Sequence, residues 1–198
     1  MTRTFIALEM HAPMQRILGR TIERFAQALP TLRWVDVTSI HLTLTFLGEL
    51  DDDRLALAME ATRAAAHDFP AFEYRLTTPG VFGSPQQPRV VWMGIEDAPL
   101  AQLHGSPLQR LYRTLNRELE RRDFETEKRP FSPHLTLARV KQPLTPSEQQ
   151  VLQRLLYTSS DAAIHTFYRV NHLNVMKSEL SRAGAKYSVL QAYELMVQ

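Results

Sequence analysis

The chain has 198 residues, 44% of them hydrophobic, and it contains no cysteine. A chain of this length fits one domain or two small lobes that share a core, and without cysteine it cannot form disulfides, thiolate metal sites or a cysteine nucleophile. Lys and Arg number 23 against 21 Asp and Glu, and the formal charge of +2 is too small for a protein that coats nucleic acid through bulk charge. A local cluster of basic residues would have to hold any anionic substrate.

No stretch of the sequence approaches the roughly 18 consecutive apolar residues of a membrane-spanning helix. Residues 1–5 lead directly into a strand pattern without a long apolar leader. Together with the lack of cysteine, this predicts a soluble, unprocessed protein of the cytoplasm that has no membrane partner. We also expect a monomer that uses neither a cofactor nor a metal.

The first third of the chain predicts strands and helices in alternation. Residues 5–8 form a short buried strand pattern, and apolar residues at helical spacing from Met14 to Leu29 predict a helix that ends before Pro30. Residues 32–37 and 40–47 predict strands. The acidic run at 51–53 suits the N-terminus of a following helix, where carboxylates interact favourably with the helix dipole. Three successive positions point around a helix and not at one ion, so a metal site is not favoured.

The rest of the chain continues this alternation. Residues 72–77 and 90–95 predict strands joined by a Gly- and Pro-rich loop over 79–88 that is long enough to form one wall of a cleft. Capping boxes predict two further helices, the second ending near residue 157. The boxes are Ser106-Pro107-Leu108-Gln109 and Thr145-Pro146-Ser147-Glu148. The last predicted strands lie at 165–168, 173–176 and 187–195.

Two tetrapeptides have the same spelling, His41-Leu42-Thr43-Leu44 and His134-Leu135-Thr136-Leu137. Both lie in strand patterns, and a strand turns successive side chains to opposite faces, so the leucines are expected to be buried while His and Thr share the free face. One copy would be weak evidence, because many histidines with perturbed pKa values are structural, but two copies favour a functional pair. A third segment, His172-Leu173-Asn174-Val175, has Asn in place of Thr, and we interpret it as structural.

The order of strands and helices predicts an α+β fold with mostly antiparallel sheets, because strand pairs are adjacent in sequence. The repeated motif predicts two pseudo-symmetric lobes with outer helices, each of which contributes one His-x-Thr strand to a central cleft. We find no linker or boundary in the sequence, and we therefore expect residues 1–198 to form a single two-lobed domain.

The flanks of the two motifs carry a resemblance to a known family. Arg33-Trp34 precedes the first motif and Phe46-Leu47-Gly48 follows it, while the second lies between Arg129-Pro130-Phe131-Ser132-Pro133 and Ala138-Arg139. With these flanks the chain resembles the two-histidine phosphoesterase superfamily, and within it the RNA 2′,3′-cyclic phosphodiesterases, also called 2′-5′ RNA ligases or LigT-like proteins. The resemblance covers nearly the whole chain.

The residue types of the two motifs suit phosphodiester chemistry. Opening a cyclic phosphate with water requires a base for the attacking water and an acid for the leaving oxygen, on opposite sides of an in-line displacement. By resemblance, His41 is the proton donor to the leaving 3′ oxygen and His134 the proton acceptor, and a 2′-phosphomonoester remains. Thr43 and Thr136 would donate hydrogen bonds to the non-bridging oxygens. The reverse reaction would join RNA ends through a 2′-5′ linkage, so the expected partner is RNA with a 2′,3′-cyclic phosphate or a 2′-5′ linkage.

The resemblance also assigns Arg139 and Phe46 to the substrate, although strict alternation from the histidines places both on the buried face. A strand end or a β-bulge would reconcile the two. We favour Arg139 as a phosphate ligand, because a charged side chain on a core face would need a buried partner. Phe46 fits an ordinary core aromatic as well as a ring that stacks on a base or ribose.

Other basic and aromatic residues are less informative. Lys128, Arg129 and Lys141 fit either a guide for the RNA backbone or a solvated rim, and Arg33-Trp34 fits either a substrate contact or, for the Trp, a place in the core. The five remaining histidines are expected to be solvated or structural; they are His11, His67, His104, His165 and His172.

The residues alone leave other functions open. The same site would suit a phosphodiesterase for small cyclic nucleotides or for an ADP-ribose cyclic phosphate. A nucleotide- or RNA-binding module without turnover is a further alternative. A zinc hydrolase is less favoured, because such sites usually have three protein ligands and no His, Asp or Glu is spaced to complete a set.

Overall fold

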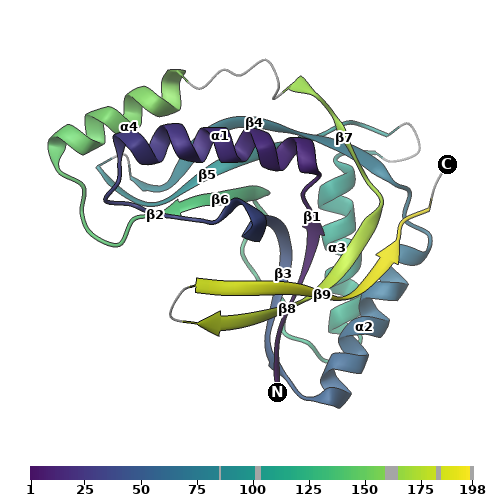
Figure 1. The fold of residues 1–198 in the computed structure, drawn as a ribbon. Coiled ribbons are helices and arrows are strands. Elements are labelled where there is room, and N and C mark those ends of the chain that lie inside the picture. The colour runs from purple at the N-terminus through teal and green to yellow at the C-terminus, as the bar shows by residue number, and fades with distance from the viewer. Residues whose placement is uncertain (85, 101–103, 159–164, 182–183, 197–198) are drawn as a thin grey trace.

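The computed structural model describes residues 1–84, 86–100, 104–158, 165–181 and 184–196 (Figure 1). The elements follow one another as β1 (Thr2–Glu9), α1 (Ala12–Ala28), β2 (Arg33–Trp34), η1 (Val37–Ser39), β3 (His41–Leu50), α2 (Asp52–His67), β4 (Phe72–Ser84), β5 (Gln87–Asp97), α3 (Pro107–Glu120), β6 (His134–Arg139), α4 (Pro146–Thr158), β7 (Tyr168–Val170), β8 (His172–Ser181) and β9 (Gly184–Glu194). Here η1 is a short 3₁₀ helix.

These strands form a four-stranded sheet in the order β3-β1-β8-β9 and a five-stranded sheet in the order β2-β6-β5-β4-β7. Among the described residues, all neighbouring strands in the two sheets are antiparallel. Helices α2 and α3 pack against the four-stranded sheet, whereas α1 and α4 lie along the five-stranded sheet (Figure 1). The predicted α+β fold of two lobes with outer helices is confirmed.

Each sheet contains one of the two motif strands. The first motif opens β3, at the edge of the four-stranded sheet, and the second opens β6, between β2 and β5 of the five-stranded sheet. Buried side chains from α1, α2, α3 and both sheets form one hydrophobic cluster. Full burial of each large apolar side chain stabilises the fold by roughly 1.5–3 kcal/mol, so the cluster holds both motif strands firmly.

The capping boxes form the helix starts that they predict. Thr145 Oγ1 accepts a hydrogen bond from the Glu148 N–H (3.3 Å), and the Glu148 carboxylate accepts one from the Thr145 N–H (2.8 Å). Ser106 Oγ accepts from the Gln109 N–H (3.0 Å), but the Gln109 side chain donates instead to the Phe131 carbonyl (3.1 Å). The start of α3 is therefore tied to the segment that leads into the second motif.

The structure differs most clearly from the sequence prediction in the Gly- and Pro-rich segment. Residues 79–88 do not form a long loop, because β4 and β5 run through most of the segment and pair as a hairpin. A Cβ atom added to Gly80 would lie 2.4 Å from the Trp92 ring, so this glycine serves a close approach between strands. A register shift between Leu76 and Pro79 accommodates the proline. Residue 85 lies outside the described residues.

Two predicted strands are shorter than expected. Residues 32–37 form only the two-residue β2 and then enter η1, because the Asp36 carboxylate accepts the Thr38 N–H (2.8 Å) and turns the backbone. Residues 165–167 precede β7, which begins at Tyr168. In the part of the chain that the structure describes, no helix has the length and apolar character needed to cross a membrane.

Candidate active site

The two motif strands turn the predicted faces inward. Leu42, Leu44, Leu135 and Leu137 are all buried in the core. The His and Thr side chains of both motifs are half-buried on the opposite faces and line one cleft of about 870 Å³ between the sheets. The alternation predicted from the sequence is confirmed, and the fold brings the two motifs to the same cleft.

A β-bulge follows the Thr of each motif. In β3 the pairing with β1 passes from Thr43 to Thr45, and in β6 the pairing with β5 passes from Thr136 to Ala138. One Leu of each motif is thus the extra residue, and two successive side chains in each strand are buried. The bulge returns Phe46 and Arg139 to the His face, where both line the cleft. The bulge thus explains why both side chains lie on the His face, although strict alternation would place them on the buried face.

Both imidazoles are oriented by the same local bond. His41 Nδ1 lies 2.9 Å from the Ser39 carbonyl, and His134 Nδ1 lies 2.7 Å from the Ser132 carbonyl. A carbonyl only accepts hydrogen bonds, so Nδ1 carries the proton in each ring. Nε2 then has a lone pair when the ring is neutral and an N–H when it is charged. Each histidine is therefore able to act as a base or as an acid through Nε2.

The surroundings of the two rings differ. The His41 ring lies 4.5 Å from the Phe5 ring centroid and 4.7 Å from that of Tyr187, with Tyr187 edge-on. Burial lowers the pKa of His41, and the bond to the Ser39 carbonyl opposes this in part. The His134 ring meets Phe82 edge-on at 4.7 Å. The first histidine is thus the more enclosed of the two.

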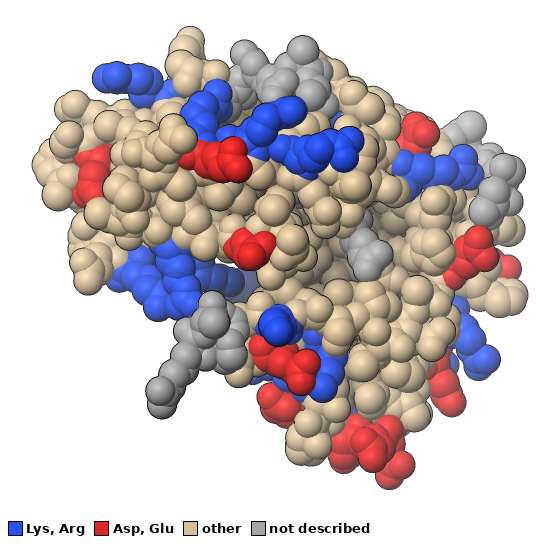
Figure 2. Space-filling model, viewed as in Figure 1, with Lys and Arg blue, Asp and Glu red and all other residues tan. Residues whose placement is uncertain are grey.

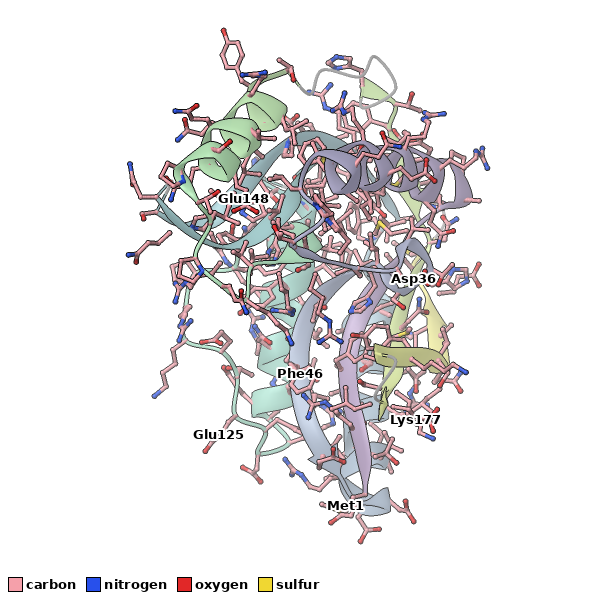
Figure 3. All side chains as sticks on the ribbon, turned by 60° about the vertical axis from the view of Figure 1, so that its left-hand side comes forward. Met1, Asp36, Phe46, Glu125, Glu148 and Lys177 are labelled. Carbon is pink, nitrogen blue, oxygen red and sulfur yellow. The ribbon has the colours of Figure 1, made fainter. Side chains whose placement is uncertain are left out.

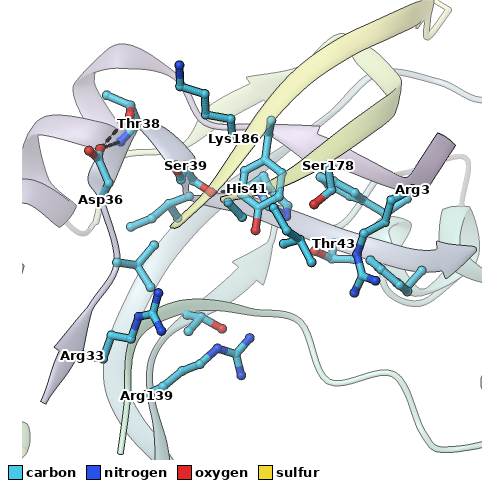
Figure 4. Close-up of a pocket in the computed structure, with 18 of the residues that line it drawn as sticks. Arg3, Arg33, Asp36, Thr38, Ser39, His41, Thr43, Arg139, Ser178 and Lys186 are labelled. Carbon is cyan, nitrogen blue, oxygen red and sulfur yellow. Dashed lines mark hydrogen bonds between the residues drawn. The ribbon is translucent and has the colours of Figure 1, made fainter. Parts of the chain in front are cut away.

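Basic side chains lie around the His and Thr side chains of the two motifs. Arg3, Arg33, Arg139 and Lys186 line the cleft, and among the described lining residues Asp36 is the one carboxylate. Hydrogen bonds from Thr38 occupy Asp36 and lower its pKa, so Asp36 is engaged beside η1 (Figure 4). Figure 2 shows Lys and Arg gathered on the left of the molecule, over the region of β2 and β6. The cleft is therefore suited to an anionic ligand.

Phe46 is not a core aromatic. Its side chain is 50% exposed, and it projects from β3 between the levels of Asp36 and Met1 (Figure 3). The Arg3 guanidinium carbon lies 4.7 Å from the centroid of the Phe46 ring, and the Phe5 ring is nearly parallel to it at 6.3 Å. This leaves a planar aromatic and guanidinium surface at the mouth of the cleft, of the kind on which a nucleobase stacks.

The remaining predicted residues separate clearly. Arg33 lines the cleft, whereas Trp34 both lines it and supports the core, because its Nε1 donates to the Leu29 carbonyl (3.0 Å) and its ring meets Phe25 edge-on. The basic residues Lys128, Arg129 and Lys141 are exposed and lie outside the cleft lining. None of the five other histidines lines it either; His11, for example, bonds the Arg169 carbonyl through Nε2. In the described residues, no three His, Asp or Glu side chains are grouped so as to hold a metal ion.

Sequence reasoning gave no site role to Phe5, Tyr187, Arg3 or Lys186. A signal was present for two of them, because Arg3 and Phe5 alternate on the face of β1 that also faces the cleft. Tyr187 and Lys186 come from β9, which only tertiary structure brings beside the first motif. These residues supply the enclosure of His41 and part of the positive charge.

Comparison with known proteins gives consistent matches. The family model described as the 2′-5′ RNA ligase superfamily matches residues 15–182. The RNA 2′,3′-cyclic phosphodiesterase of Thermotoga maritima is 29% identical over 189 residues, which cover 95% of this chain and 92% of the relative. The protein of the same name from Aeropyrum pernix is 30% identical over 173 residues, 87% of this chain and 92% of that relative.

Solved structures agree with this fold. A protein of Thermus thermophilus superposes with a TM-score of 0.76 at 23% identity, over 98% of this chain and 97% of that one. E. coli LigT in complex with 3′-AMP superposes with a TM-score of 0.67 at 25% identity, over 98% of both chains. The likeness covers both sheets and therefore both motif strands.

Proposed function

The chain belongs to the 2′-5′ RNA ligase superfamily, and from this premise we propose that it hydrolyses RNA 2′,3′-cyclic phosphate ends to 2′-phosphomonoesters by metal-independent acid-base catalysis. The observation that carries the proposal is the pair of imidazoles in one cleft, one from each sheet, each with Nδ1 on a backbone carbonyl and Nε2 available. The names of the curated relatives support the same reaction.

His134 is the proton acceptor in this proposal, and His41 is the proton donor. Neutral Nε2 of His134 removes a proton from water, the water oxygen bonds to phosphorus, and the bond from phosphorus to the 3′ oxygen breaks. Nε2–H of His41 protonates that leaving oxygen. The phosphate remains on the 2′ oxygen, and each turnover leaves the two histidines with exchanged protonation states that solvent restores. The assignment of the two roles follows the order of the motifs in the family.

The lowered pKa of His41 opposes its role as a donor in the free protein, because less of the ring is protonated at neutral pH. A cyclic phosphate carries one negative charge, and a negative charge next to an imidazole favours the protonated ring. Binding of the substrate would therefore raise the pKa of His41 and charge the donor in the complex. The enclosure by Phe5 and Tyr187 also strengthens this charge interaction, because it keeps water away from the ring.

Four other side chains complete the proposed site. The hydroxyls of Thr43 and Thr136 donate to the non-bridging phosphate oxygens, where charge develops in the transition state. The Arg139 guanidinium binds the phosphate, and the exposed Phe46 ring stacks on the terminal base or ribose. All four side chains line the same cleft as the two histidines.

The test uses an oligonucleotide that ends in a 2′,3′-cyclic phosphate, incubated with the protein in EDTA. The expected product has a 2′-phosphate end. A 3′-phosphate product, tight binding without turnover, or activity that depends on added metal would each contradict the proposal. With a 5′-hydroxyl RNA in place of water the same groups would form a 2′-5′ linkage, but hydrolysis is expected to dominate in water.

RNA is favoured over small cyclic nucleotides because the curated relatives are named for RNA ends. Comparison of turnover on mononucleotide, ADP-ribose cyclic phosphate and oligonucleotide substrates tests this preference. We further propose that the protein works as a monomer in the cytoplasm. Size-exclusion chromatography and cell fractionation test these two points.

A further inference from the structure

Two arginines of the cleft lie directly opposite each other. Arg33 of β2 is the register partner of Arg139 of β6, and both side chains are exposed and line the cleft. Like charges at directly opposed positions of an antiparallel pair destabilise it. Figure 4 shows both side chains extending into the cleft from the same side. A bound anion would remove the repulsion between them.

In the part of the chain that the structure describes, no carboxylate neutralises either guanidinium. Within the described residues, neither Arg33 nor Arg139 has a carboxylate at ion-pair distance. Asp36 is close in sequence to Arg33, but its carboxylate accepts hydrogen bonds from Thr38. Arg3 differs, because its guanidinium lies over the Phe46 ring. The two opposed arginines therefore form a positive site with no internal partner among the described residues.

The two arginines lie on neighbouring strands, and only one of these strands carries a motif. Arg139 is on the same strand as His134 and Thr136, whereas Arg33 lies one strand farther out, about 5 Å away across the sheet. If the reacting phosphate engages Arg139, as proposed above, Arg33 on the neighbouring strand is left for a second anionic group. A terminal nucleotide with a 2′,3′-cyclic phosphate has its next phosphate on the 5′ oxygen, so a second anion near the site comes from there.

We propose that Arg33 binds the phosphate on the 5′ side of the terminal nucleotide, next to the reacting phosphate held by Arg139. This inference rests on the proposed function and names its substrate class as a polynucleotide end or a 5′-phosphorylated nucleotide, in preference to a nucleoside cyclic phosphate. The planar guanidinium presents paired N–H donors that match phosphate oxygens. Arg33 is then a specificity-determining residue for chain length.

The proposal can be tested by mutation, because Arg33 lies where a substitution should not disturb the core. Strand β2 is two residues long and lies at the edge of its sheet, and the core contacts there come from Trp34 and not from Arg33. Substitution of Arg33 is therefore expected to leave the fold intact. Arg16 on an exposed position of α1 is outside the cleft lining and offers a control that removes the same charge.

The kinetic test compares adenosine 2′,3′-cyclic phosphate with the same compound carrying a 5′-phosphate. Arg33→Gln should lower kcat/KM about tenfold on the 5′-phosphorylated substrate, the order expected for loss of one charge-assisted phosphate contact in an exposed cleft, and should leave the other substrate unchanged. Arg33→Lys should retain part of the preference, and Arg16→Gln all of it. Equal losses on both substrates, or no loss on either, would overturn the inference.

A binding test separates this inference from the proposed function. Calorimetric titration with adenosine 2′,5′-bisphosphate and adenosine 2′-monophosphate requires no turnover. The protein should bind the bisphosphate more tightly, and Arg33→Gln should remove that difference. If neither cyclic substrate is hydrolysed but this preference is present and lost in the variant, the proposed function fails and the second phosphate site stands. If the cyclic substrates are hydrolysed normally but the protein binds the bisphosphate no more tightly than the monophosphate, the proposed function stands and the inference about Arg33 fails.

Discussion

The two halves of the cleft are built from the same tetrapeptide and end in different environments. In each half the strand has a bulge after the Thr, and the imidazole Nδ1 bonds the carbonyl two residues before it. The first ring is enclosed by Phe5 and Tyr187, and the second meets Phe82 alone among the described ring contacts. Local sequence therefore sets how each histidine is presented, and neighbours from other strands set how far each ring is enclosed. For His41 this burial lowers the pKa.

The difference bears on the two opposite roles that we propose for one motif. An acid and a base that act together need different protonation states at one pH. Burial of His41 favours its neutral form, so the proposed donor depends on the anionic substrate to raise its pKa. The residues after the bulges differ in the same way, since Phe46 offers a ring on one side and Arg139 a charge on the other. The repeated motif gives the two histidines the same local geometry, and the residues around it give them different surroundings.

Removal of either histidine should have the largest effect. His41→Ala and His134→Ala should each lower kcat/KM on an RNA cyclic phosphate by about 10²- to 10⁴-fold, the usual contribution of a general acid or base. The double variant should lose far less than the product of the two losses, because the residues act as a unit. His172→Ala, in the third similar segment, is the matched control and should keep full activity. A loss in the double variant equal to the product of the two single losses would contradict the view that the two histidines act as a coupled pair.

A substrate with a good leaving group should separate the two roles. A nitrophenyl ester of a nucleotide phosphate releases nitrophenolate, which leaves without a proton, so an acid is no longer needed. His41→Ala should recover much of its lost rate on this substrate, while His134→Ala should remain poor. The measurement is the ratio of rates on the nitrophenyl and RNA substrates for each variant. Recovery of the His134 variant alone would reverse the assignment of donor and acceptor. Equal recovery of both variants would leave the assignment without support.

Removal of either Thr hydroxyl should lower the activity less than removal of a histidine. Thr43→Val and Thr136→Val keep the shape of the side chain and should each lower activity by about 10- to 1000-fold, mainly in kcat, because the hydrogen bonds strengthen as charge develops on the phosphate. Steady-state kinetics with separate kcat and KM values measures this. A change confined to KM in either variant would show that the hydroxyl binds the ground state equally well, contrary to the proposal.

The smallest effect expected is on pH dependence. Burial places the pKa of His41 below the ordinary value of about 6.5, so the protonated donor is lost, and kcat/KM falls, as the pH rises through that lower value. Tyr187→Ala should expose the ring to water and move this alkaline limb to higher pH. NMR titration of the His41 ring measures the pKa directly.

Phe82→Ala is the matched change in the other half, and it should leave the His41 titration where it was. A shift of the His41 pKa to lower values in the Tyr187 variant would contradict burial as the cause. In the complex the anionic phosphate should raise the pKa of His41, so the alkaline limb of kcat should lie at higher pH than that of kcat/KM.

The prediction of loop and strand lengths shows where local patterns fail. Residues 79–88 have the composition of a loop, but their glycine and proline serve a bulge and the close packing of Trp92 within a hairpin. The two capping boxes, by contrast, were predicted correctly, because the donor and acceptor of a cap lie within four residues of each other. A local sequence pattern therefore predicts local structure well only when the residues that interact lie close together in the chain.

By itself the sequence determined the two motif strands, the buried side of each and the residues that face away from the core, because these depend on alternation along one strand. Only the tertiary structure decided that both bulges follow the Thr residues, since register is a property of two paired strands. It also decided the enclosure of His41 by β1 and β9 and the opposition of Arg33 to Arg139. The pairing of distant segments is not written in the periodicity of either one, and it sets the positive charge of the cleft and the lowered pKa of His41.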